Sequence, residues 1–92
     1  MLIYLLCYDL EDDALRDRAA RLLLGYGQRV QRSVYELWFR TPAQFDALQA
    51  KLGKLLPKGA NLRWYRLTVA GMADSGSLDR QPPKPPPAAV IW

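Results

Sequence analysis

Asp9 is the residue of this sequence best placed to carry chemistry. It directly follows an apolar run, residues 1–8, and such a run predicts a β-strand that is buried on both faces. A carboxylate at the end of a buried strand must be balanced by basic residues, by water or by a hard cation such as Mg²⁺. The chain contains no histidine, which excludes the commonest general base and the commonest transition-metal ligand. Any chemistry must therefore use carboxylates, hydroxyls, lysine, arginine, or a metal ion held by oxygen.

Arginines form the second group of interest. The chain has 13 Lys and Arg against 9 Asp and Glu, a net charge of +4, which indicates either a basic solvated surface or a polyanionic partner. The guanidinium fork suits phosphate, and the arginines are spread along the chain as contacts to a nucleic acid backbone would be. For Arg16, Arg18 and Arg21, the alternative is a solvated helix face with Asp13 and Asp17 as partners. The arginines concerned are Arg16, Arg18, Arg21, Arg29, Arg32, Arg40, Arg63 and Arg66.

Ser33 carries a hydroxyl group directly after Arg32. No histidine and no adjacent lysine could activate it as a nucleophile. We therefore interpret Ser33 as a hydrogen-bonding residue at a strand kink.

The elements that position these residues alternate along the chain. A strand over about 2–8 is followed by an acidic turn, in which Asp12 or Asp13 can cap a helix over about 14–24. Gly25 and Gly27 offer two positions for a left-handed helix cap. The extended stretch 29–40 changes its apolar face midway, which predicts a kink, a bulge or a short hairpin near residues 32–33.

The second half of the chain repeats the pattern. Residues 41–44 have the composition of a capping box with proline at the first helical position, and apolar residues follow at helical spacing up to Pro57. A strand over 61–69 follows. The order predicts an α+β, ferredoxin-like βαββαβ fold, with one antiparallel sheet and both helices on one face. Core or interface packing is the preferred interpretation of the sheet aromatics, and base stacking is the alternative: Tyr35, Trp38, Trp64 and Tyr65.

The predicted domain organisation has three parts. Residues 1–70 form the ferredoxin-like domain, 71–87 a polar and proline-rich linker, and 88–92 an apolar edge strand suited to a partner subunit's sheet. The single Cys7 indicates a reducing compartment. No signal peptide is evident and the apolar start is too short to span a membrane, so we expect a cytoplasmic protein without a membrane partner.

The first 36 residues carry a family resemblance. Tyr8-Asp9 closes the first strand, Arg16 and Arg18 lie on the helix, and residues 26–36 read Tyr-Gly-Gln-Arg-Val-Gln-Arg-Ser-Val-Tyr-Glu. This resembles the small CRISPR-associated adaptation protein family, the second and smaller subunit of the spacer-acquisition complex. The family pattern has strand-Tyr-Asp, a helix with paired arginines, and then Tyr-Gly-x-Arg-Val-Gln-x-Ser-Val-Phe-Glu. Tyr35 stands where Phe is more usual.

The resemblance implies both a fold and a set of site residues. Members are ferredoxin-like two-fold dimers in which the C-terminal strand joins the partner's sheet. They are metal-dependent nucleases on single-stranded RNA or double-stranded DNA, and they bridge copies of the larger integrase subunit. The family's metal-binding catalytic aspartate corresponds to Asp9, and its basic residues to Arg16, Arg18 and Arg29. Arg32 shares the segment of Arg29 and is grouped with these nucleic-acid-binding arginines, and the expected supporting residues are Tyr8, Ser33 and Tyr35.

Two functions from different classes follow. In the first, a Mg²⁺ ion between Asp9 and its symmetry mate polarises a phosphate and makes the protein an endonuclease. In the second, the homodimer is a non-catalytic scaffold that bridges DNA to the integrase subunits. A toxin-type ribonuclease from a related ferredoxin-like family is a further alternative.

Overall fold

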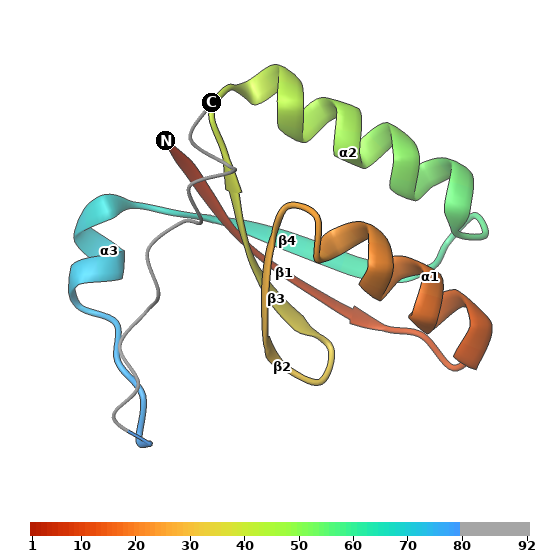
Figure 1. Cartoon of the computed structure of the whole chain (residues 1–92), viewed down its shortest axis with the longest axis horizontal. Helices are drawn as coiled ribbons and strands as arrows, with labels where there is room; N and C mark the ends of the chain where they lie inside the picture. Colours follow the sequence, from red (N-terminus) through yellow and green to blue (C-terminus); the bar gives the residue numbers. More distant parts are fainter. Residues whose placement is uncertain (80–92) are drawn as a thin grey trace.

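The structure, a computed structural model, describes residues 1–79 (Figure 1). The predicted edge strand 88–92 and the proline-rich stretch 82–87 lie outside the described residues. The described part contains four strands and three helices in the order expected, with one addition. Their bounds are β1 Leu2–Asp9, α1 Asp13–Leu23, β2 Gly27–Gln31, β3 Val34–Phe39, α2 Pro42–Leu55, β4 Asn61–Leu67 and α3 Val69–Ala73.

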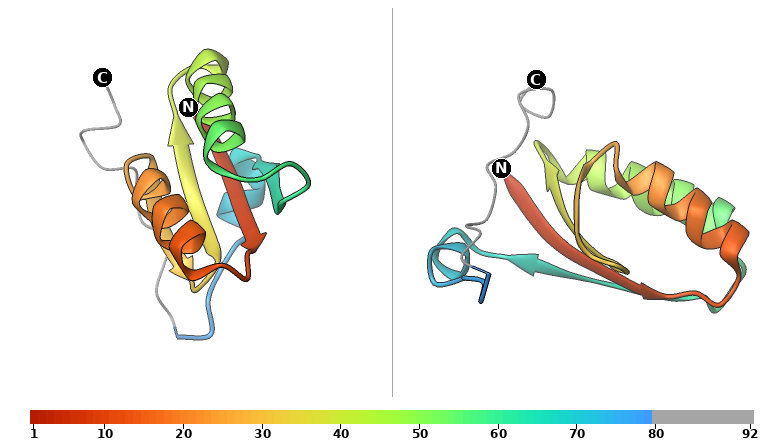
Figure 2. Two further views of the ribbon diagram at one scale, coloured as in Figure 1. Left: turned by 90° about the vertical axis from the view of Figure 1, so that its right-hand side faces the viewer. Right: turned by 60° about the horizontal axis from the view of Figure 1, so that its bottom comes forward.

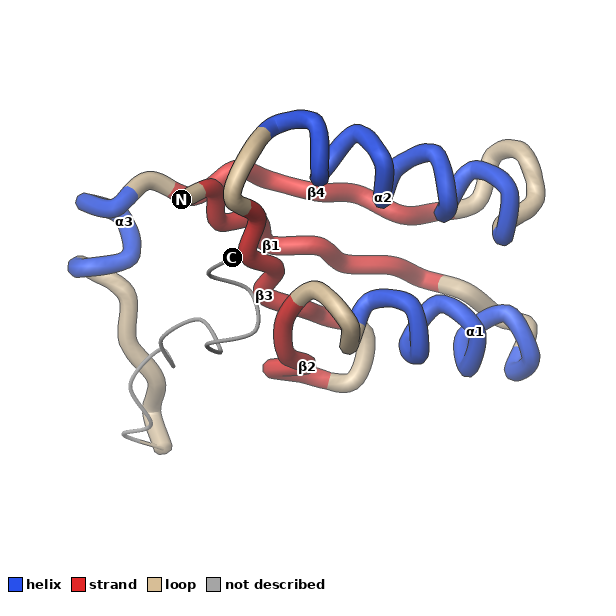
Figure 3. Tube along the Cα trace, turned by 45° about the horizontal axis from the view of Figure 1, so that its top comes forward, coloured by secondary structure: helices blue, strands red, loops and turns tan. Residues whose placement is uncertain are grey.

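One sheet organises the molecule. Its strand order is β2-β3-β1-β4, and each neighbouring pair is antiparallel. Helices α1 and α2 lie side by side on one face of this sheet (Figures 2 and 3). The arrangement is the split βαβ plan of a ferredoxin-like α+β fold, and the predicted fold class is confirmed.

The break predicted near Arg32–Ser33 is a β-hairpin. Residues 32–33 form the turn between β2 and β3, and the pairing register shifts between Arg29 and Gln31, which marks a bulge. The shift explains why no single alternation runs through the segment.

The core lies between the sheet and the two helices. Leu6 and Tyr8 of β1 and Tyr35 of β3 contribute from the sheet, and Leu23 of α1 and Leu48 of α2 close over them. Aromatic contacts join the layers, with the rings of Tyr4 and Phe45 stacked at 3.9 Å between centroids. Burying each large side chain stabilises the fold by roughly 1.5–3 kcal/mol. This apolar burial holds the helices against the sheet.

Strand β1 is not buried on both faces, contrary to the prediction. Leu6 and Tyr8 face the helices and are buried, whereas Ile3, Leu5 and Cys7 are only partly buried. We call the side away from α1 and α2 the open face. By register it also carries residues of β3 and β4 that pair with Ile3, Leu5 and Cys7, namely Val34, Glu36, Trp38, Arg63, Tyr65 and Leu67. An apolar run of this kind does not distinguish a strand covered on both faces from a strand covered on one face.

The helix starts follow the predicted chemistry. The Asp12 carboxylate accepts a hydrogen bond from the backbone N of Leu15 at 3.1 Å and caps α1. The Gln44 side-chain oxygen accepts from the backbone N of Arg40 at 2.6 Å and of Thr41 at 3.3 Å, which secures the start of α2. Side-chain hydrogen bonds therefore fix the residue at which each helix begins.

The prediction of a left-handed helix cap at Gly25 or Gly27 was wrong. Among the described glycines only Gly59 has a positive φ, of 84°, so neither Gly25 nor Gly27 is a left-handed cap. Gly27 begins β2, where a Cβ atom would stand 1.9 Å from the carbonyl oxygen of Glu36, so glycine there permits a close backbone approach. The segment after β4, expected to be linker from residue 71, begins with the short helix α3, which Thr68 caps through the backbone N of Gly71.

No helix in residues 1–79 has the length and apolar character needed to cross a membrane.

Candidate functional site

Asp9 is the last residue of β1 and is exposed. Its neighbours Tyr8 and Leu10 are both buried on the helix side, and alternation along the strand places Asp9 on the open face, with Cys7 and Leu5. Across the sheet it pairs in register with Asn61 of β4. The expectation of a costly carboxylate at a buried strand end is therefore wrong, because Asp9 lies at the exposed end of a half-covered strand.

The acidic residues of the described part of the chain do not form a multi-ligand metal site. Within residues 1–79 no group of three His, Cys, Asp or Glu side chains lies close enough together to hold one. The Asp9 carboxylate is exposed, and within residues 1–79 its side chain has no hydrogen bond or ion pair. Mg²⁺ commonly takes one or two protein carboxylates and completes its shell with water. Within a single chain, Asp9 therefore offers one carboxylate ligand.

The basic residues gather elsewhere, in a cleft between α1 and the β2–β3 hairpin. This α1–hairpin cleft has a volume of about 380 Å³. Arg29 and Arg32 are exposed at its hairpin side, and neither has an ion pair within the described residues. The cleft is lined by Tyr8, Asp13, Arg16, Asp17, Ala20, Arg29, Arg32 and Ser33. Two unpaired guanidinium groups beside hydroxyl groups are suited to an anion such as a phosphate.

A pair of tyrosines lies beside this cleft. The hydroxyl groups of Tyr8 and Tyr35 are 3.3 Å apart and share a hydrogen bond, and their rings are stacked with centroids 5.9 Å apart. Burial, aided by this hydrogen bond, raises the pKa of Tyr8 to about 12. Tyr8 therefore keeps its proton at neutral pH, so its hydroxyl can donate a hydrogen bond but cannot act as a base.

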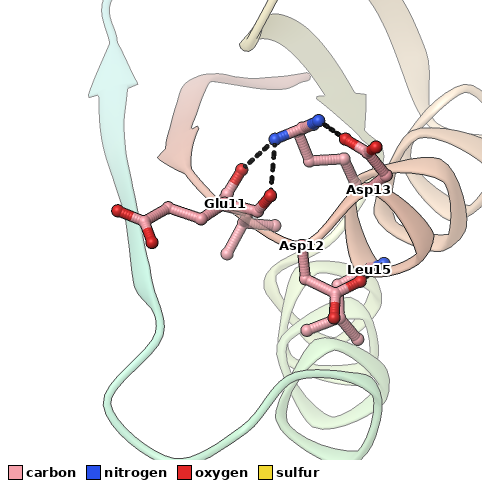
Figure 4. Close-up of polar contacts among 6 residues, drawn as sticks. Glu11, Asp12, Asp13 and Leu15 are labelled. Carbon is pink, nitrogen blue, oxygen red and sulfur yellow. Dashed lines mark hydrogen bonds and ion pairs between the residues drawn. The ribbon is translucent and has the colours of Figure 1, made fainter.

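Arg16 is held by the connection between β1 and α1 (Figure 4). Its Nη1 donates to the carbonyl oxygen of Leu10 at 2.7 Å and to that of Glu11 at 3.0 Å, and its Nη2 forms an ion pair with Asp13. Arg18 is exposed on α1 and does not line the cleft. The two helix arginines, which sequence reasoning treated alike, therefore have different surroundings.

The structure thus brings together six of the eight predicted site residues and separates two. The six that lie in or beside the cleft are Tyr8, Arg16, Arg29, Arg32, Ser33 and Tyr35. Asp9 lies on the open face, and Arg18 lies elsewhere on α1. Asp13 and Asp17 also line the cleft; sequence reasoning named them only as ion-pair partners of the helix arginines, which for Asp13 is confirmed.

Comparisons with known proteins give a consistent result. The family model for the CRISPR associated protein Cas2 matches residues 1–73. The chain is 37% identical over 92 residues, 99% of both chains, to a protein of Synechocystis sp. named CRISPR-associated endoribonuclease Cas2 3. It is 44% identical over 71 residues, 75% of both chains, to CRISPR-associated endoribonuclease Cas2 1 of Chloroflexus aurantiacus. Among solved structures, a chain of a partial Cas6-RT-Cas1–Cas2 complex superimposes with a TM-score of 0.80 at 34% identity, covering 89% of this chain and 96% of that one.

Proposed function

The chain belongs to the CRISPR-associated Cas2 family, and from this membership we propose that it is the small subunit of a CRISPR adaptation complex. In this role a homodimer binds nucleic acid and docks the larger integrase subunit during spacer acquisition. We further propose that the dimer is a Mg²⁺-dependent endonuclease on single-stranded RNA or double-stranded DNA, with Asp9 as its metal-binding catalytic residue.

One observation carries the proposal of cleavage: the exposed Asp9 lies on the open face of the sheet, and part of that face is apolar. Leu5 and Leu67 are only partly buried there and Tyr65 is 52% exposed, and such a surface favours association with a second copy. A two-fold dimer through this face would bring the two β1 strands, and with them the two Asp9 carboxylates, toward one axis. A Mg²⁺ ion held by both would neutralise charge on a phosphodiester.

The chain's own residues have separable tasks in this proposal. The guanidinium groups of Arg29 and Arg32 bind backbone phosphates in the α1–hairpin cleft. The protonated Tyr8 hydroxyl, hydrogen-bonded to Tyr35, and the hydroxyl of Ser33 can donate to the same anion. Asp9 supplies the metal ligand on the other side of the sheet.

Cleavage is tested with labelled single-stranded RNA and duplex DNA, each with Mg²⁺ and with EDTA. We expect the wild type to cut one of the two substrates, and to do so with Mg²⁺ but not with EDTA. Asp9→Asn should cut neither substrate but still bind both. Asp46→Asn on α2 is the matched control, because it removes the same charge from an exposed position far along the chain. Equal cutting by the wild type and Asp9→Asn would remove Asp9 from the chemistry.

The homodimer is tested by substitution on the open face. Leu5→Lys places a charge at the centre of that face, opposite Glu36 of β3, which can pair with it in the monomer. We expect dissociation in sedimentation velocity without loss of fold. Leu24→Lys is the control, because Leu24 is already 54% exposed at the end of α1. Dimers that survive Leu5→Lys would place the interface elsewhere.

A specific observation also favours the non-catalytic scaffold. Each protomer offers a single exposed carboxylate at the proposed centre, and the basic cleft lies on the other side of the sheet from it. Spacer acquisition in cells separates the two functions. If Asp9→Asn supports acquisition while Arg29→Gln with Arg32→Gln does not, bridging is the function and cleavage is dispensable.

A further inference from the structure

Arg16 uses most of its donors inside the protein. A guanidinium has five N–H donors, and both hydrogens of Nη1 point to carbonyl oxygens, of Leu10 at 2.7 Å and of Glu11 at 3.0 Å. Nη2 is paired with Asp13 (Figure 4). The side chain of Arg16 is 35% exposed. Its charge is therefore largely balanced by the carboxylate and the two carbonyl dipoles before any external anion arrives.

The segment that Arg16 holds is the link between Asp9 and helix α1. Leu10 follows Asp9 directly, and its side chain is buried in the core. Residues 10–12 lie between β1 and α1, so the carbonyl groups of Leu10 and Glu11 have no strand partner, and Arg16 supplies one for each. On the helix side, Asp12 caps α1 through the backbone N of Leu15, and its carbonyl accepts from the backbone N of Arg16. Arg16 thus holds the β1–α1 connection through its carbonyl groups, and Asp12 holds it at the start of the helix.

We propose that Arg16 is a positioning residue, which holds the β1–α1 connection and so orients the Asp9 carboxylate, and that it is not a phosphate ligand. The phosphate contacts fall to Arg29 and Arg32, which lack ion-pair partners within the described residues. This assignment differs from the expectation that both helix arginines contact nucleic acid. Its activity readout rests on the proposed cleavage at Asp9, whereas its binding and exchange readouts do not.

Nucleic-acid binding gives the first test. The logarithm of duplex affinity falls with the logarithm of salt by about 0.9 for each phosphate contact. Arg16→Gln should leave this slope unchanged, whereas Arg29→Gln should flatten it by about 0.9 per protomer bound. A flattened slope in Arg16→Gln would show that Arg16 contacts phosphate and would overturn the proposal.

Cleavage kinetics give the second test. Misplacing a reacting group by about 1 Å can cost roughly a hundredfold in rate, so Arg16→Gln should lower kcat by about 10- to 100-fold with KM within about twofold. Arg16→Lys should not restore kcat, because an ammonium lacks the rigid fork that reaches two carbonyl groups and a carboxylate together. Full recovery with lysine, or a change confined to KM, would contradict a positioning role.

Hydrogen exchange gives a test that needs no activity. Losing two hydrogen bonds of about 1 kcal/mol each should speed exchange of the capped Leu15 amide by at least about fivefold in Arg16→Gln. Arg21→Gln removes the same charge from the exposed last turn of α1 and should leave that amide unchanged. If the wild type neither cuts nor binds, the proposed function fails while this measurement still decides the role of Arg16. Unchanged exchange at Leu15 would refute that role.

Discussion

Replacing Gly27 by alanine should damage the sheet at the strand that carries Arg29. A Cβ atom added to Gly27 would stand 1.9 Å from the carbonyl oxygen of Glu36 and 2.8 Å from Cα of Leu37, whereas ordinary contact begins at 3.4 Å. Both neighbours are backbone atoms of β3, so no side chain can rotate away. The first residue of β2 must separate from β3 by more than about 1 Å, and the pairing of Gly27 with Leu37 must weaken.

The size of the effect follows from that geometry. Overpacking of this kind costs about 1–3 kcal/mol, and a weakened ladder hydrogen bond adds about 1 kcal/mol. A loss of about 3 kcal/mol lowers Tm by about 12 to 24 °C in a domain of this size. Calorimetry or thermal circular dichroism at one fixed protein concentration measures it, because dimer formation would make Tm depend on concentration.

Gly53→Ala is the matched substitution. Gly53 lies inside α2, and a methyl group added there would have no neighbour within 4 Å, so alanine should stabilise the helix by about 0.5–1 kcal/mol and raise Tm. The two variants add the same methyl group and should move Tm in opposite directions. Shifts of the same sign and similar size would show that β2 does not approach β3 as closely as described.

Other measurements test other parts of the molecule. Because the folded state holds the Tyr8 proton up to a pKa of about 12, above the ordinary 10.0, stability to urea should be complete below about pH 10 and fall toward pH 12, and Tyr8→Phe should reduce that fall. Gln44→Ala should cost about 1 kcal/mol, or about 4 to 8 °C in Tm, because two backbone N–H groups at the start of α2 lose their acceptor. If two Asp9 carboxylates share an ion, Mg²⁺ should raise the Tm of the wild type, EDTA should reverse the rise, and Asp9→Asn should show none.

The element order was predictable because each boundary has a local chemical cause. Asp12 caps one helix, Gln44 secures the other, and the change of apolar face at residues 32–33 marks a hairpin. The missed features depend on contacts between distant segments. Gly27 was predicted to be a helix cap from its place at the end of the helical pattern. Glycine is needed there for a different reason, the close approach of Glu36, which is nine positions along the chain. Local pattern carries no information about such an approach.

The candidate site was predictable as a set of residues but not as an arrangement. Tyr8 and Asp9 are adjacent in the sequence and therefore face opposite sides of the sheet, which leaves Asp9 apart from the cleft that contains Tyr8, Arg29 and Ser33. The role of Arg16 depends on two carbonyl oxygens at positions 10 and 11. Carbonyl groups are present at every residue, so no sequence pattern indicates that a side chain will bind them.

The separation of Asp9 from the α1–hairpin cleft has a consequence for substrate length. A single phosphate cannot contact both the open face and the guanidinium groups of Arg29 and Arg32 on the helix side. If Asp9 cuts and the cleft binds, as proposed, a nucleic acid that reaches both must pass around the end of β1. Several nucleotides would then lie between the phosphate that is bound and the bond that is cut. We therefore expect a dinucleotide to compete for binding without being cleaved, and cleavage to begin only with longer strands. Measuring kcat/KM across a series of oligonucleotide lengths tests this, and efficient cleavage of a dinucleotide would mean that one site performs both tasks.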